Sequence, residues 1–224
     1  MAEPDPITVA VPHVPRLEDL GLARDRPLVI VDVDEVLGMF MRGFGNFVTS
    51  QGYEMRVERF ALLQSIYRPG AAEHLEIDEG RKLFQTFFRA HCGEMDVAPG
   101  AIEALARLAT RAEILILSNA PAEAQALRAA WLRRHDLPHP LILSSGPKGP
   151  ITAALTAQSS GRSAFVDDLI SNLDSVAEHA PATARFQHVA DEQLRPLTPT
   201  RPDLHPRIDD WKLLGEAIEQ QILR

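Results

Sequence analysis

In the sequence Pro27-Leu-Val-Ile-Val-Asp-Val-Asp-Glu-Val-Leu37, an unbroken apolar run ends at two carboxylates. A run of this kind, rich in β-branched residues, predicts a strand that is buried on both faces of a parallel sheet. Asp32 and Asp34 are separated by one residue, so both can converge on one reacting group just past the strand. Carboxylates beside so apolar a run are costly unless a cation or protons neutralise them. The stretch therefore favours a functional site over its plain alternative, an acidic surface turn or helix cap.

The length and composition are those of an ordinary globular protein of one domain, with room for a small insert. The chain has 224 residues, of which 45% are hydrophobic and 24% charged, and its formal net charge is -8. An acidic surface attracts neither nucleic acid nor an anionic membrane, so we expect neither as a partner. The single cysteine, Cys92, excludes an intrachain disulfide and favours a reducing compartment. Because no run has the length of a membrane span and no secretory signal pattern is present, we expect a cytoplasmic protein.

Apolar runs and helical patterns alternate along most of the chain. After the first strand, further strands are predicted at 114–117, 141–143, 164–166 and, more weakly, 184–189, with helices between them and at 209–223. This alternation predicts an α/β fold, a Rossmann-like parallel sheet that is flanked by helices.

Composition divides the chain into three parts. Residues 1–25 contain four prolines and predict an extended lead-in on the surface, with no chemistry assigned. Residues 26–37 and 97–224 carry the strands and helices of the core. Residues 38–96 interrupt them with a helix loosened by glycines, an irregular or extended stretch, and a helix with phenylalanines at helical spacing. We expect this segment to be a small, mostly helical cap insert.

Polar residues stand at or after the carboxyl end of each of the first four predicted strands, the edge at which parallel sheets bind ligands. In chain order they are Asp32 and Asp34, then Ser118 and Asn119, then Lys148, and finally Asp167 and Asp168. Taken singly, each is better explained as a helix cap or a solvated charge. Four such sets at one edge of the sheet predict a single site.

These residue types suit phosphoryl transfer through an aspartyl-phosphate. The reaction needs a carboxylate nucleophile, Mg²⁺ held by carboxylates, waters and phosphate, donors and a cation for the oxygens of the transferring group, and a second acid for the leaving oxygen and for water. Asp32 would be the nucleophile, and Asp167 and Asp168 would hold Mg²⁺. Ser118 and Lys148 would donate to the oxygens of the transferring group. Asp34 would protonate the leaving oxygen and then activate water.

The ordered set resembles the motifs of the haloacid dehalogenase (HAD) superfamily of hydrolases, in its phosphatase branch. Asp32-Val-Asp34-Glu-Val36 is similar to the first motif, Leu117-Ser118-Asn119 to the second, Lys148 to the third, and Val166-Asp167-Asp168 with the following Asn172 to the fourth. The resemblance covers residues 27–37 and about 97–175, with 38–96 where the family often inserts a helical cap. Glu35 departs from the pattern, because many members have glycine there. At the turn into the cap it could alter substrate fit or add a charge at the mouth of the site.

The resemblance implies a role for each matched residue. Asp32 is the nucleophile and a metal ligand, and Asp34 is the acid/base and also gives its backbone carbonyl to the metal. The other implied residues are Asp167 and Asp168 for the metal, Ser118 and Lys148 for catalysis, and Ser118, Asn119 and Lys148 for the substrate phosphate. The implied activity is Mg²⁺-dependent hydrolysis of a small phosphorylated metabolite, by a monomer or a homodimer.

Other functions stay open at this point. The chain could be a non-catalytic HAD-like protein that binds a ligand or regulates a partner, or it could be a phosphomutase, a phosphonatase or a dehalogenase. Asp34 disfavours dehalogenation, which has no leaving alkoxide to protonate, and a phosphonatase needs a cap lysine, for which the insert offers only Lys82. A phospho-receiver domain uses the same residue types, but its acidic pair precedes the phosphorylated aspartate.

The cap determines the substrate in such folds, and its residues are less informative. The residues that could bind anionic parts of a substrate are Arg42, Arg56, Arg59, Arg68 and His91, although a surface role is expected for each. The residues that could floor a pocket are Met39, Phe40, Phe44 and Phe47, although these are expected to form the cap's own small core.

Overall fold

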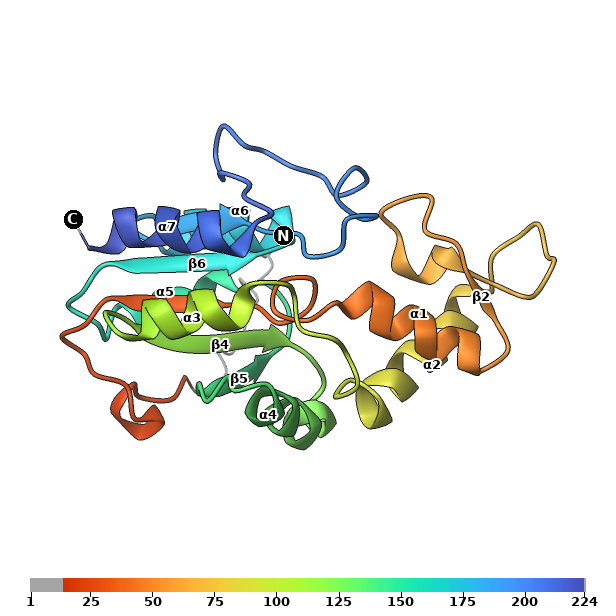
Figure 1. Cartoon of the computed structure of the whole chain (residues 1–224), viewed down its shortest axis with the longest axis horizontal. Helices are drawn as coiled ribbons and strands as arrows, with labels where there is room; N and C mark the ends of the chain where they lie inside the picture. The colour runs from red at the N-terminus through yellow and green to blue at the C-terminus, as the bar shows by residue number, and fades with distance from the viewer. Residues whose placement is uncertain (1–13, 224) are drawn as a thin grey trace, which may run out of the picture.

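The computed structural model describes residues 14–223 and is built around a five-stranded parallel sheet in the order β5-β4-β1-β6-β7 (Figure 1). The strands are β1 (Leu28–Val31), β4 (Glu113–Asn119), β5 (Leu141–Ser144), β6 (Ser163–Asp167) and β7 (Ala184–Gln187). The central strand, β1, is buried along its whole length between β4 and β6. Helices cover both of its faces, which is why its sequence shows no polar alternation. The predicted Rossmann-like α/β fold is confirmed.

Helices cover both faces of the sheet (Figure 1). They are α3 (Ala101–Ala109), α4 (Gln125–Arg134), α5 (Gly149–Thr156), α6 (Ile170–His179) and α7 (Trp211–Ile222). Val29 and Val31 pack in one apolar cluster with α3 and α7, whereas Leu28 and Ile30 pack in a second cluster with α5 and α6. Alternate side chains of a strand point to opposite faces, so the four apolar residues of β1 supply both halves of the core. Within residues 14–223, no helix is long and apolar enough to span a membrane.

The described part of the lead-in, residues 14–25, has mostly exposed or partly exposed side chains, and two of its leucines are buried. A short 3-10 turn, Glu18–Leu20, ends at Gly21, and the side chains of Leu17 and Leu22 are buried in the second apolar cluster. The backbone N–H of Leu17 also donates to Oε1 of Gln158 at 3.0 Å. Burial of two leucines anchors this segment to the core, because it removes their apolar surface from water. The rest of the predicted lead-in, residues 1–13, lies outside the described residues.

The segment between β1 and α3 lies beyond the carboxyl ends of the strands (Figure 1). It contains α1 (Phe40–Ser50), the small hairpin of β2 (Glu54–Met55) and β3 (Ile66–Tyr67), the 3-10 turn Leu62–Ser65, and α2 (Ile77–Ala90). Glycines do not interrupt α1: a Cβ at Gly43 would lie 2.8 Å from the Met95 side chain, so glycine permits close packing there. Phenylalanines of α1 and α2 stack on one another, for example Phe40 on Phe44 with ring centroids 5.7 Å apart.

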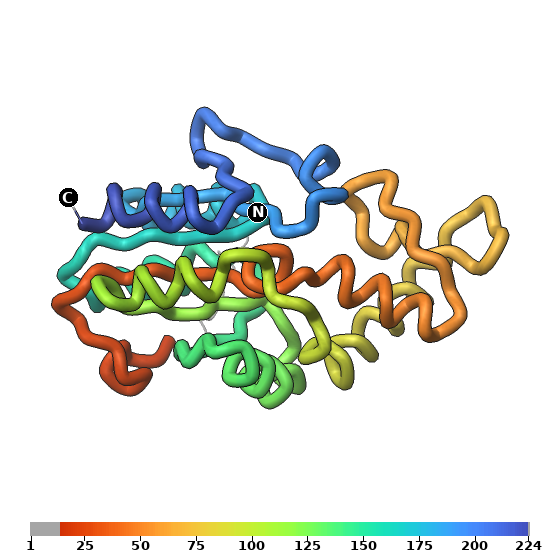
Figure 2. The backbone as a smooth tube through the Cα atoms, in the orientation of Figure 1, coloured from red at the N-terminus to blue at the C-terminus, as the bar shows by residue number. Residues whose placement is uncertain are grey.

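The loop after β7 joins this cap segment to the core. Figure 2 shows the loop reaching the cap segment, and Leu194 of the loop lines the same cavity as Phe60. His188, at the start of the loop, is buried with its ring centroid 5.1 Å from that of Trp211. Its Nδ1 lies 2.8 Å from the carbonyl oxygen of Ile208. Burial lowers the pKa of His188 from its ordinary value of 6.5 to about 4, although the bond to Ile208 opposes this change.

This burial makes stability depend on pH. Between about pH 6.5 and 4 the unfolded chain protonates His188 while the folded protein keeps it neutral, so stability is full above this window and falls as the pH falls through it. Relative to His188→Asn, the wild-type free energy of unfolding is expected to drop by about 3 kcal/mol from pH 7 to pH 4. Urea unfolding of both proteins at several pH values measures the difference, in which other titrating groups cancel. A difference that does not change with pH would contradict the prediction.

Candidate active site

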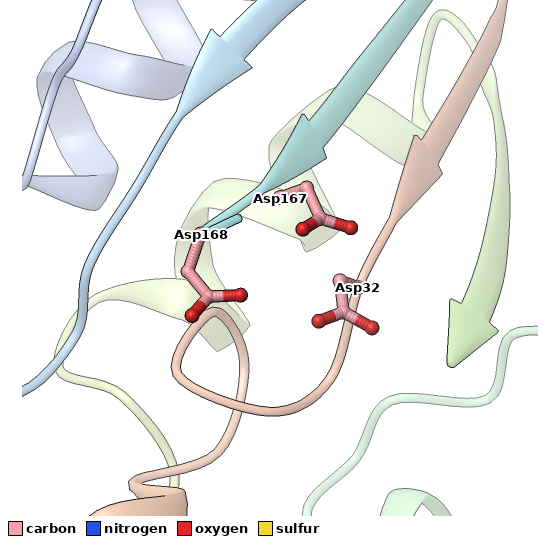
Figure 3. A group of neighbouring side chains, drawn as sticks. All are labelled: Asp32, Asp167 and Asp168. Carbon is pink, nitrogen blue, oxygen red and sulfur yellow. The ribbon is translucent and has the colours of Figure 1, made fainter. Parts of the chain in front are cut away.

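Three carboxylates gather at the carboxyl ends of β1 and β6 (Figure 3). Asp32 follows β1, Asp167 is the last residue of β6, and Asp168 comes next; one oxygen from each lies within 4.8 Å of those of the other two. All three side chains are buried. The strands are paired so that Val31 lies opposite Val166, and the N–H of Asp32 donates to the carbonyl of Val166 at 3.0 Å. This register places the residues that follow the two strands side by side.

The Lys148 ammonium lies inside this cluster. Nζ is 2.6 Å from Oδ1 of Asp32 and 2.7 Å from Oδ2 of Asp167, and the lysine side chain is 1% exposed. Lys148 precedes the first residue of α5, Gly149, where a Cβ would lie 2.2 Å from the carbonyl oxygen of Ser175 in α6. Only glycine permits so close a packing of α5 on α6. This packing brings the lysine to the end of β6.

The charges of the cluster do not balance. Three carboxylates face one ammonium, so the fully ionised cluster has an excess of two negative charges. Burial raises the pKa of Asp32, with further contributions from Asp167 and Asp34 and opposition from Lys148. Burial also raises the pKa of Asp168, and the neighbouring carboxylates of Asp167 and Asp32 add to this. For Lys148, burial alone would lower the pKa, but Asp167 and Asp32 outweigh it and raise the pKa.

The cluster fits a divalent cation of the Mg²⁺ type. Its donors are carboxylate oxygens, which hard cations prefer, and three of them lie within reach of one ion. A charge of +2 would offset the excess and reverse the rise in the carboxylate pKa values. Asn172 of α6 holds Asp167 in place by donating from Nδ2 to both carboxylate oxygens, at 3.0 and 3.2 Å. The backbone N–H of Leu169 donates to Oδ1 of Asp167 at 2.9 Å.

The Asp34 carboxylate stands apart from the three and is paired with Arg128. Nη2 of Arg128 donates to Oδ1 of Asp34, and the guanidinium lies over the ring of Phe88, 5.2 Å from its centroid. The arginine side chain is fully buried in α4, and in the part of the chain that the structure describes its Nε and Nη1 have no hydrogen-bond partner. Arg128 was not identified from the sequence. A signal existed, since it lies three and four residues before Trp131 and Leu132, on the buried stripe of the helix.

The two residues that end β4 are placed differently from each other. The Ser118 hydroxyl is buried and has no hydrogen-bond partner among residues 14–223, and Ser118 is not among the residues that line the cavity above the cluster. Asn119 already holds the loop after β5: its Nδ2 donates to the carbonyl of Gly146 at 2.9 Å, and its Oδ1 accepts from Oγ of Ser144 at 2.7 Å. Asn119 lines the cavity above the cluster, as Lys148 does.

Known proteins resemble this structure in fold. No model of a protein family matches the chain, and no curated protein matches it in sequence. Among solved structures, a HAD-superfamily hydrolase from Ehrlichia chaffeensis superposes with a TM-score of 0.54 at 16% identity, covering 89% of this chain and 99% of that one. A candidate HAD-hydrolase from Bacillus subtilis, YfnB, was solved with magnesium bound. It superposes with a TM-score of 0.57 at 13% identity, covering 88% of this chain and 99% of that one. A candidate phosphoglycolate phosphatase from Lactobacillus plantarum superposes with a TM-score of 0.55 at 12% identity, covering 86% of this chain and 99% of that one.

The chain has the HAD-like fold. The superpositions extend over nearly all of the neighbours' length, so the cap segment and the sheet are both part of the likeness. Within this fold, the acidic cluster with Lys148 occupies the carboxyl ends of the strands, where α/β sheets bind ligands.

Glu35 lines the cavity above the cluster, as expected for a residue at the turn into the cap, but it is almost fully buried, at 3% exposed. It accepts hydrogen bonds from the backbone N–H groups of Met41, in the first turn of α1, at 2.6 Å, and of Asp191 at 3.0 Å. Its carboxylate thus joins the start of the cap to the loop after β7. Glu35 has a φ of 60°, a backbone conformation that favours glycine, and these two hydrogen bonds offset the cost of a larger residue there. Burial raises the pKa of Glu35 to about 7, although the two N–H donors lower it.

A cavity of about 290 Å³ lies between the cluster and the cap of the HAD-like fold. Its core side includes the carboxylates of Asp32 and Asp168 and the ammonium of Lys148, and its cap side includes Phe40 and Phe84. Phe40 is therefore both a member of the cap's aromatic cluster and a wall of the cavity. The space is at the small end of the range for ligand pockets, about 300 to 1,000 Å³.

Proposed function

We propose that the chain is a Mg²⁺-dependent phosphatase that hydrolyses a small-molecule phosphate monoester through an aspartyl-phosphate on Asp32. The observation that carries the proposal is the buried cluster of Asp32, Asp167 and Asp168 around Lys148, with its excess of two negative charges. The magnesium bound to the B. subtilis neighbour supports the choice of cation, and the L. plantarum neighbour supports the choice of reaction. The buried, free thiol of Cys92 fits a reducing compartment such as the cytoplasm.

In this mechanism a carboxylate oxygen of Asp32 attacks the phosphorus atom as the ester oxygen leaves. The carboxyl group of Asp34, in its protonated form, gives its proton to the leaving oxygen, so that a neutral alcohol departs and the carboxylate that remains is paired with Arg128. The same group then takes a proton from a water molecule, whose oxygen attacks the phosphorus and returns Asp32 to its free form with release of inorganic phosphate. Asp34 lines the cavity beside Asp32, as these two steps require.

The other residues of the site would bind the cation or the phosphate group and neutralise their charges. Bound by Asp32, Asp167, Asp168 and the backbone carbonyl of Asp34, Mg²⁺ would supply positive charge to the phosphate oxygens and reduce repulsion between the phosphate and Asp32. Lys148 and the free hydroxyl of Ser118 donate to the same oxygens, and this donation matters most when charge develops on them. Asn119 keeps the loop after β5 beside the site.

The cap argues against a phosphonatase. That reaction needs a lysine from the cap, and Lys82, the only one in the insert, is exposed on α2 and does not line the cavity. The charged cap residue at the cavity is Arg59 instead, and an arginine keeps its proton and cannot form the Schiff base that a lysine forms.

Arg128 is expected to position the acid/base. Arg128→Met removes the partner of Asp34 and lets its carboxyl group turn, which is expected to lower kcat for alkyl phosphates by about 10- to 100-fold. The loss is expected to be smaller for p-nitrophenyl phosphate, whose leaving group needs no proton. Arg128→Lys is expected to recover part of the activity, and Arg133→Met, on the exposed face of the same helix, serves as the control. An equal loss for both kinds of ester would contradict a positioning role.

The proposed function is tested by phosphate release from a panel of small phosphomonoesters, with Mg²⁺ and after its removal by a chelator. We expect hydrolysis that needs Mg²⁺ and that returns when the ion is added back. If no ester gave phosphate above the background of Asp32→Asn, the chain would not be a phosphatase, and a non-catalytic ligand-binding role would take its place.

A further inference from the structure

The cavity above the acidic cluster has nearly all of its polar side chains on one side. Its core side carries the carboxylates, amides and ammonium described above. Its cap side is formed by Phe40, Met41, Phe60, Leu62, Phe84 and Phe88, together with Ala61 and Arg59. Of these cap residues, only Arg59 has a side chain that can donate a strong hydrogen bond or carry a charge.

The polar groups of the core side are largely engaged. Asp34 is paired with Arg128, Glu35 accepts from two backbone N–H groups, and both polar atoms of the Asn119 side chain are bonded within the fold. The other polar side chains of the core side, those of Asp32, Lys148, Asp168 and Asn172, belong to the acidic cluster or bond to it. A sugar hydroxyl or a second carboxylate that entered the cap side would leave water and find no partner except Arg59, which disfavours such substrates.

Phe60 provides a second, independent observation. It is a large apolar side chain that is 39% exposed, although it lies at the cavity. Leu194, in the loop after β7, lines the same cavity and is also apolar. An apolar ligand would cover the exposed part of this ring, and removing apolar surface from water favours binding.

We propose that the organic part of the substrate is apolar: the substrate is the phosphate monoester of a small aliphatic or aromatic alcohol, not of a sugar or a hydroxy acid. This inference rests on the proposed phosphatase function for the chemical step, and on the cap side of the cavity for the substrate class. Arg59, beside Phe60, lies where it attracts the anionic ester toward the site.

The test compares n-alkyl phosphates from ethyl to hexyl, whose leaving groups have nearly the same basicity, with glycerol 1-phosphate as the polar match of propyl phosphate. We expect kcat/KM to rise about fourfold for each added methylene until the cavity is full. Propyl phosphate is expected to exceed glycerol 1-phosphate by about 10- to 100-fold. A flat series, or a preference for glycerol 1-phosphate, would overturn the inference.

Phe60→Ser locates the effect in the cavity. It is expected to lower kcat/KM for hexyl phosphate more than for ethyl phosphate, since only the longer chain reaches the ring. Leu213→Ser replaces a residue of α7 that is 56% exposed and away from this cavity, and it is expected to change neither rate. Equal losses for both esters in Phe60→Ser would contradict the proposed contact.

Failure of the chemistry and failure of the substrate class give different results. Dissociation constants of n-alkylphosphonates for the Mg²⁺-loaded protein are measured by calorimetry, because these compounds cannot be hydrolysed as esters. Tighter binding with each methylene but no hydrolysis of any ester would overturn the phosphatase and keep the apolar site. Hydrolysis with no gain along either series would keep the phosphatase and overturn the apolar site.

Discussion

Replacing Asp32 with asparagine is expected to lower kcat for phosphate ester hydrolysis by a factor of about 10⁴ to 10⁶, the scale on which enzymes lose activity when their nucleophile is removed. An amide cannot form the acyl phosphate, and the change also removes one of the three carboxylates of the proposed metal site. The variant keeps the ion pair of Lys148 with Asp167 and loses a buried carboxylate whose pKa burial raises, so we expect it to fold.

Steady-state phosphate release, measured beside thermal unfolding, checks this prediction. Asp203→Asn changes an exposed aspartate in the same way and is expected to leave kcat unaltered. Turnover by Asp32→Asn close to that of the wild type would show that Asp32 is not the nucleophile.

Lys148→Met is expected to have the largest effect on stability. Methionine has a similar length but no charge, so the carboxylates of Asp32 and Asp167 would remain buried without their partner. Removing one member of a buried ion pair costs about 3 to 5 kcal/mol. We expect this loss in the metal-free protein at neutral pH. It should shrink as the pH falls, because protonation removes the buried charges, and it should shrink when Mg²⁺ is added.

Urea unfolding with a chelator and with Mg²⁺ measures the loss. Lys212→Met, on the exposed side of α7, is the matched control and is expected to change the free energy of unfolding by less than about 0.5 kcal/mol. Activity of Lys148→Met with Mg²⁺ is expected to fall by about 10²- to 10³-fold, since one donor to the phosphate oxygens is gone. A stability equal to that of the wild type under all conditions would mean that the charges of the cluster are not coupled.

The strands and the residues at their ends could be predicted from the sequence because both are local properties. An apolar run such as 28–31 indicates a strand that is buried on both faces. In a parallel sheet the carboxyl ends of all strands lie at the same edge. Asp32, Lys148 and Asp167 meet for this reason, although 19 residues separate the last two and many more separate them from the first. The fold class and the position of the acidic cluster therefore follow from local patterns in the sequence.

The partners of the remaining polar groups depend on contacts between segments that are far apart in the sequence. Arg128 pairs with Asp34 across 94 residues, and Glu35 accepts from Asp191 across 156. The apolar character of the cap side likewise depends on which faces of two helices and a loop turn toward the site. Periodicity in a sequence shows that a side chain is buried, but not against what. Contacts between distant segments depend on how whole elements pack, and this packing is set by the summed fit of many side chains and not by any short stretch.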